Sequence, residues 1–130
     1  MSQFLSSLTV TLVDELAADG RGIWMVSIPF SYQSDILKKT VTVEVGFTTD
    51  FASVPRIPGV FDAFGDRAHK AAVLHDWLYH HHEVCDKDTA DSVLKEAMRV
   101  SGIAEDIAEA FYLGVQAFGD SSYEQDAKPT

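Results

Sequence analysis

The sequence predicts an α+β domain, in which a small antiparallel sheet of about three strands packs against three helices. Apolar residues alternate with a period of two in three segments before residue 50, which is typical of strands with one buried face. After residue 65 they recur at helical spacing in three further segments. Strands followed by helices favour the α+β class. We expect a single domain over residues 1–120 and a polar C-terminal tail over residues 121–130.

The predicted strands cover residues 8–16, 23–30 and 40–47. Their buried faces are formed by Leu8, Val10 and Leu12, by Trp24, Val26, Ile28 and Phe30, and by Val41, Val43, Val45 and Phe47. Residues 18–22 and 31–39 are expected to connect them. Pro29 cannot donate a ladder hydrogen bond, so we expect it at a sheet edge or a strand end. Residues 51–65, rich in proline, glycine and phenylalanine, are expected to be irregular.

Three helices are predicted in the C-terminal half. The first begins at Asp66, a residue type that caps helix N-termini, and ends near His81. The second begins near Lys87 and ends before Gly102, a plausible C-terminal cap. The third ends at Gly119. The apolar face of the second helix is Ala90, Val93, Leu94, Ala97 and Met98, and that of the third is Ile107, Ala110, Phe111, Gly114, Val115 and Phe118.

Charge and hydropathy exclude two classes of partner. The net charge of −10 argues against binding to a nucleic-acid backbone, which requires a basic face. No apolar run reaches the length of a membrane span, so we expect no membrane insertion. Cys85 is the single cysteine, which excludes an internal disulfide.

Most candidate site residues lie in the first two helices. In "KAAVLHDWLYHHH", residues 70–82, His75 occupies the centre of the apolar stripe and Asp76 lies about 100° round the helix. Asp76 and His80 are four residues apart and can approach a common point, a spacing that suits a shared metal ion or a charge pair. Asp50 follows a predicted strand and is a candidate third ligand.

Asp91 borders the apolar stripe of the second helix, where a carboxylate needs a partner. The connection between the first two helices is short, so we expect them to pack antiparallel and to bring Asp91 toward His75. A carboxylate that holds one imidazole nitrogen fixes the tautomer and leaves the other nitrogen as a base or ligand. Three interpretations stay open: a buried polar network, a hydrolytic or metal site that uses calcium or zinc, and a site for binding alone.

Three motifs carry a family resemblance. "GFTTDFASVPR", "AAVLHDWLYHH" and "TADSVLKEAM", followed by a "GVQAFG" helix, resemble an uncharacterised family of tailed phages and prophages over most of residues 40–119. The resemblance implies a small accessory protein, structural or interacting, of the virion or tail. Its partners would be phage structural proteins or a second copy of itself. Its location would be the host cytoplasm during expression or the phage virion.

The helix "AAVLHDWLY" is also similar to the active-site helix of secretory and parvoviral phospholipases of the A-two class. That resemblance implies an alternative function, a metal-dependent hydrolase. In it His75 is the base, Asp76 binds calcium, Asp91 orients His75 and Tyr79 supports the pair. The glycine-rich calcium loop of that family is not matched, since residues 57–65 offer only Gly59 and Gly65.

Overall fold

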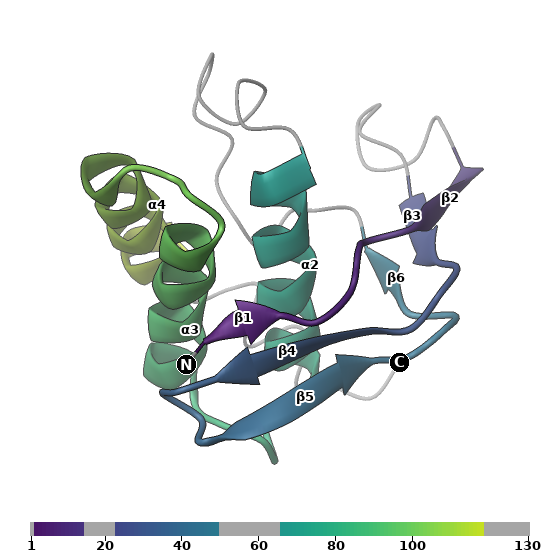
Figure 1. Cartoon of the computed structure of the whole chain (residues 1–130), viewed down its shortest axis with the longest axis horizontal. Coiled ribbons are helices and arrows are strands. Elements are labelled where there is room, and N and C mark those ends of the chain that lie inside the picture. The colour runs from purple at the N-terminus through teal and green to yellow at the C-terminus, as the bar shows by residue number, and fades with distance from the viewer. Residues whose placement is uncertain (1, 15–22, 50–65, 119–130) are drawn as a thin grey trace.

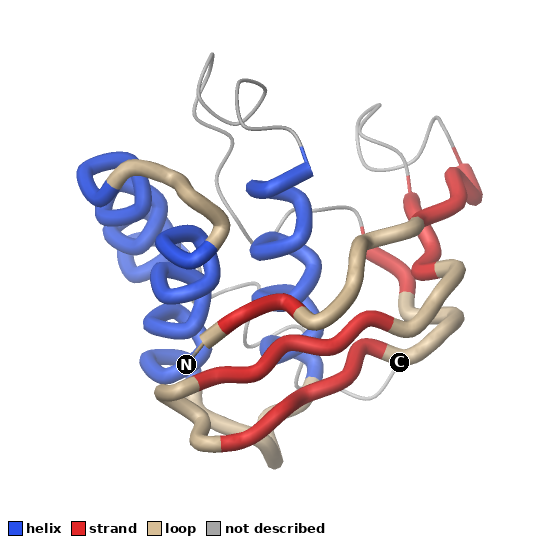
Figure 2. Tube along the Cα trace, viewed as in Figure 1, coloured by secondary structure: helices blue, strands red, loops and turns tan. Residues whose placement is uncertain are grey.

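The computed structural model describes residues 2–14, 23–49 and 66–118, and it confirms the α+β class. Strands occupy the N-terminal half and helices the C-terminal half (Figure 2). In the part of the chain that is described, the strands form two antiparallel sheets rather than one. The division into residues 1–120 and 121–130 stays a prediction, because residues 119–130 lie outside the described ranges.

Each sheet has three strands (Figure 1). The first has the order β1 (Gln3–Phe4), β4 (Phe30–Ser34) and β5 (Lys39–Val43). The second has the order β2 (Val10–Asp14), β3 (Ile23–Val26) and β6 (Thr48–Thr49).

The expected strand 23–30 is in fact two strands in different sheets. β3 ends at Val26, and β4 begins at Phe30. Pro29 lies between them, immediately before β4, as expected for a residue that cannot donate to a ladder. The prediction that Ile28 is buried was wrong, because its side chain is exposed at this change of sheet.

The expected connection 31–39 was also wrong, because it contains most of β4. Phe30, Tyr32 and Ser34 are buried in alternation, so the period of two is present but one of its members is polar. The turn that follows is tight, and Lys38 adopts a positive φ of 58° in it.

The other two strand predictions were right in part. β5 buries Val41 and Val43 but ends there, and Val45 is exposed before a turn in which Gly46 has a φ of 94°. In β2 the predicted buried face is incomplete, because Leu12 is exposed. The expected connections at 18–22 and 51–65 lie outside the described residues.

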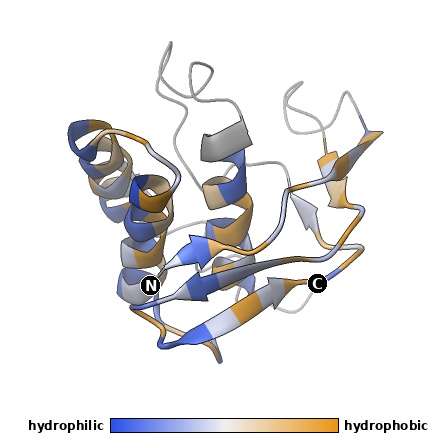
Figure 3. Ribbon diagram, viewed as in Figure 1, coloured by the Kyte–Doolittle hydropathy of each residue, from blue (hydrophilic) through white to orange (hydrophobic). Residues whose placement is uncertain are grey.

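All three helices are where the sequence predicts them: α2 (Asp66–His80), α3 (Lys87–Val100) and α4 (Glu105–Phe118). α3 begins at an Asp86 cap, whose side chain accepts a hydrogen bond from the Thr89 N–H, and it ends before Gly102, whose φ is 87°. Figure 3 shows hydrophilic and hydrophobic residues alternating along α3 and α4, as in amphipathic helices.

The buried face of α3 includes every residue predicted for it. On α4, Phe111 and Val115 are buried as predicted, whereas the prediction for Ala110 was wrong, since Ala108 is buried and Ala110 is exposed. None of the described helices combines the length and the apolar character needed to cross a membrane.

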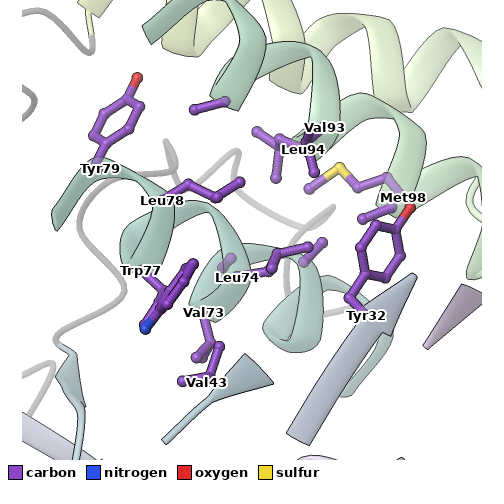
Figure 4. Close-up of a cluster of buried hydrophobic side chains, with 14 of the residues drawn as sticks. Tyr32, Val43, Val73, Leu74, Trp77, Leu78, Tyr79, Val93, Leu94 and Met98 are labelled. Atoms are coloured by element: carbon purple, nitrogen blue, oxygen red, sulfur yellow. The ribbon is translucent and has the colours of Figure 1, made fainter. Parts of the chain in front are cut away.

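α2 is the central helix of the core. Each residue from Ala71 to Tyr79 is buried, so this stretch of α2 is covered on all sides. Figure 4 shows Val43 of the first sheet next to Val73 of α2, and Tyr32 of the same sheet next to Met98 of α3. A helix enclosed in this way has no solvent-facing side for its polar residues. His75 and Asp76 therefore lie inside the protein, and their hydrogen bonds must be made there.

Glu96 of α3 connects this helix to the first sheet through hydrogen bonds. One of its carboxylate oxygens accepts hydrogen bonds from the Tyr32 hydroxyl at 2.7 Å and the Ser34 hydroxyl at 2.9 Å. The other accepts from the Ile36 N–H at 3.1 Å. Burial, and then the neighbouring Glu96, raise the pKa of the Tyr32 phenol above its ordinary value, so the hydroxyl stays protonated and donates.

We expect Glu96→Ala to lower the free energy of unfolding by about 1–3 kcal/mol, because it leaves the buried hydroxyls of Tyr32 and Ser34 without their acceptor. Chemical denaturation measures the change. Glu83→Ala is the control: this exposed glutamate lies between α2 and α3, and its loss should change stability by no more than about 0.5 kcal/mol. Equal effects of the two variants would contradict this role for Glu96.

Candidate functional site

The predicted meeting of His75 with Asp91 occurs in the structure. α2 and α3 run in opposite directions side by side (Figure 1), and the His75 Nε2 lies 2.7 Å from the Asp91 Oδ1. Both side chains are 0% exposed. The short connection between the helices and the apolar stripes around both residues are what bring them together.

Asp91 accepts four hydrogen bonds. His75 Nε2 and the Tyr79 hydroxyl, at 2.6 Å, donate to Oδ1. Lys87 Nζ, at 2.8 Å, and Gln116 Nε2, at 2.5 Å, donate to Oδ2. A carboxylate has about four lone-pair positions, so these donors saturate it. We call these five residues the Asp91 cluster.

The Asp91 cluster joins all three helices. His75 and Tyr79 lie one turn apart on α2, Lys87 and Asp91 one turn apart on α3, and Gln116 on α4. Lys87 Nζ also donates to the Val115 carbonyl of α4 at 3.1 Å. The rings of His75 and Tyr79 are in contact, with centroids 4.1 Å apart. A single carboxylate therefore connects the three described helices through hydrogen bonds.

The charges within the cluster are fixed by burial and by these hydrogen bonds. Burial lowers the pKa of His75 below its ordinary 6.5, although the bond to Asp91 acts in the opposite direction. Burial alone would raise the pKa of Asp91, but the bonds from His75, Lys87 and Tyr79 outweigh it and hold the pKa below 3.8. At neutral pH the cluster thus contains a neutral imidazole and an ionised carboxylate, with Lys87 as the cation.

The neutral imidazole has a defined tautomer. An ionised carboxylate only accepts hydrogen bonds, so the proton of His75 is on Nε2 and the lone pair on Nδ1. This arrangement is compatible with two roles. It stabilises a buried polar network, and it orients an imidazole whose Nδ1 is basic.

The predicted metal ligands are only partly brought together. His80 Nδ1 lies 2.8 Å from the Asp76 carbonyl oxygen and 3.8 Å from the Asp76 carboxylate. Asp50 lies outside the described residues. Within residues 2–14, 23–49 and 66–118, no group of three or more His, Cys, Asp or Glu side chains is placed to hold a metal ion. The calcium or zinc site stays a prediction.

Two members of the Asp91 cluster were missed from the sequence. Lys87 was recognisable, since it lies four residues before Asp91 on the same helix, a spacing at which opposite charges meet. Gln116 carried no such signal, because its contact with Asp91 depends on how α4 packs against α3.

Residues 24–115 match the model of a protein family described as 'Protein of unknown function (DUF1353)'. The chain belongs to this family. The match spans both sheets from β3 onward and most of α4, so the whole Asp91 cluster except Gln116 lies inside it. No curated protein and no solved structure matches the chain.

Asp91→Asn should lower the free energy of unfolding by about 3–5 kcal/mol, because it removes the charge that pairs with Lys87 and turns amide hydrogens toward existing donors. Asp88→Asn is the matched control on the same helix. Asp88 is exposed in the first turn, so its charge interacts mainly with the helix dipole and should contribute no more than about 1 kcal/mol. Urea denaturation of both variants measures the difference, and similar losses would contradict the saturated-carboxylate assignment.

Stability should fall on acidification below pH 6.5. Below pH 6.5 His75 is protonated in the unfolded chain, whereas burial keeps it neutral in the folded chain, so the unfolded state binds more protons. The free energy of unfolding therefore falls by up to about 1.4 kcal/mol for each pH unit of acidification. Protonation of Asp91 adds to this loss of stability only below pH 3.8. Denaturation at pH 7, 6 and 5 measures the slope, and His75→Gln should flatten it. Equal slopes in the two proteins would contradict a buried neutral His75.

Proposed function

We propose that this chain is a small accessory protein of a phage or prophage, which acts through protein contacts and uses the Asp91 cluster to hold its helices together. The observation that carries the architectural part of the proposal is the burial of the centre of the cluster. The side chains of His75 and Asp91 are both 0% exposed, and each oxygen of Asp91 already accepts two hydrogen bonds.

The burial of His75 favours architecture over catalysis. A general base has to come within hydrogen-bond reach of the proton it removes, directly or through one water. In this structure Leu74, Leu78 and Tyr79 around it are fully buried as well. Satisfied networks of this kind specify one packing of the core without a ligand.

The phage or prophage origin is supported by the resemblance of "GFTTDFASVPR", "AAVLHDWLYHH" and "TADSVLKEAM" to proteins of tailed phages. The negative net charge agrees with contacts to protein rather than to nucleic acid. We propose the host cytoplasm as its location during expression and the virion or tail as its destination.

A metal-dependent hydrolase is the second candidate, and one observation favours it. Asp91 holds Nε2 of His75, and Tyr79 donates to the same carboxylate oxygen, which is the division of roles that the phospholipase resemblance implies. Asp76, 6% exposed, follows His75 directly and would carry the metal. In this candidate Nδ1 of His75 would accept a proton from water as the water attacks an ester carbonyl. It would return that proton to the leaving alkoxide when the acyl C–O bond breaks, which releases an acid and an alcohol.

His75→Ala separates the two candidates. If the cluster is architectural, the variant loses about 1–3 kcal/mol of stability, because Asp91 loses a donor in a buried site. The wild type then hydrolyses neither phospholipid vesicles nor small esters, with or without calcium or zinc. Urea denaturation and a titrimetric release assay measure the two quantities.

Ester hydrolysis by the wild type that His75→Ala abolishes, with an unchanged unfolding midpoint, would overturn the architectural proposal in favour of the hydrolase. Asp76→Asn then tests the metal, since it should abolish hydrolysis and calorimetric binding of the ion together. Asp88→Asn, an exposed aspartate on α3, serves as the control that should leave hydrolysis unchanged.

A further inference from the structure

Among the described residues, β5 is an edge strand of the first sheet. It pairs with β4 on one side, and no strand of the described residues pairs with its other side. In Figure 1, β5 runs along the lower margin of the molecule. An open edge presents backbone N–H and C=O groups that can continue the sheet with another strand.

The edge lacks most of the features that keep edge strands from pairing. Its register with β4 is regular over five residue pairs, from Phe30–Val43 to Ser34–Lys39, whereas β2 shows a register shift between Leu12 and Asp14. The sequence of β5, KTVTV, contains no proline, and its inward residues Val41 and Val43 are apolar. Lys39 is the one charged residue within the strand.

The charges at the two ends of β5 have opposite signs. Lys38 and Lys39 lie at its beginning, and Glu44 follows its last residue. All three are exposed, and the Glu44 carboxylate is held in place by a 2.8 Å hydrogen bond from Trp77 Nε1. With this order of charges, two copies of the strand bring opposite charges together only when they run antiparallel.

Antiparallel pairing about Val41 places Thr40 opposite Thr42 of a second copy, and Lys39 opposite its Val43. Lys38 of each copy then lies opposite Glu44 of the other copy, and the twofold axis generates this contact twice. Parallel pairing would instead align the lysines with each other, and like charges opposite one another destabilise a sheet.

We propose that β5 pairs antiparallel with β5 of a second copy of this chain, which joins the two first sheets into one of six strands. The inference gives the proposed interaction role a defined partner, and it does not depend on the Asp91 cluster. A five-residue strand covers much less area than the 1,200–2,000 Å² of a typical stable interface, so the dimer should dissociate on dilution.

Sedimentation equilibrium of the wild type and three variants tests the pairing. Lys38→Glu and Glu44→Lys each place like charges at both symmetric contacts and should raise the dimer dissociation constant by about tenfold or more. The double variant restores opposite charges in reversed order and should dimerise like the wild type. It also keeps the net charge of −10, so it separates the local pairing from overall repulsion.

Three outcomes overturn the proposal. The first is a wild type that stays monomeric up to about 1 mM. The second is a dimer that the single variants leave intact, and the third is a double variant that stays as weak as the singles. Thermal melts of each variant verify the fold, since Glu44→Lys also removes the bond to Trp77. None of these outcomes bears on the hydrolysis test of His75, so the two proposals fail separately.

Discussion

The carboxylate of Asp91 has no contact with solvent, and an ionised group in such a place costs several kcal/mol unless hydrogen-bond donors replace the water. Four donors do so here, and they come from three helices. The requirement is strict, because removing any one donor leaves part of a buried charge unsatisfied. The relative positions of α2, α3 and α4 therefore follow from one residue's need for partners as much as from the apolar packing around it.

Glu96 is a second carboxylate on α3, and its hydrogen bonds connect α3 to the first sheet. Glu96 binds two side chains of β4 and one N–H of the turn after it, while Asp91, five residues earlier, binds the other helices. The two acids point to different sides of one helix, which makes α3 the element through which helices and sheet are fixed to each other.

The sequence was informative wherever apolar periodicity and burial coincide. The buried face of α3 and the approach of His75 to Asp91 were predictable, because both depend on helical spacing and a short connection. β4 was missed because Ser34 is buried and polar, and its acceptor, Glu96, is 62 residues away in the chain. Gln116 was missed for the same reason: a tertiary contact, rather than a local pattern, gives it its role.

The protonation of His75 tests this account most directly, since a neutral imidazole that donates from Nε2 to an ionised Asp91 is its central claim. Long-range ¹H–¹⁵N NMR spectra distinguish the two tautomers and the imidazolium, and a titration follows the pKa. The account predicts the Nε2–H tautomer at pH 7 and a pKa below 6.5. A charged His75 at pH 7, or a proton on Nδ1 alone, would contradict it.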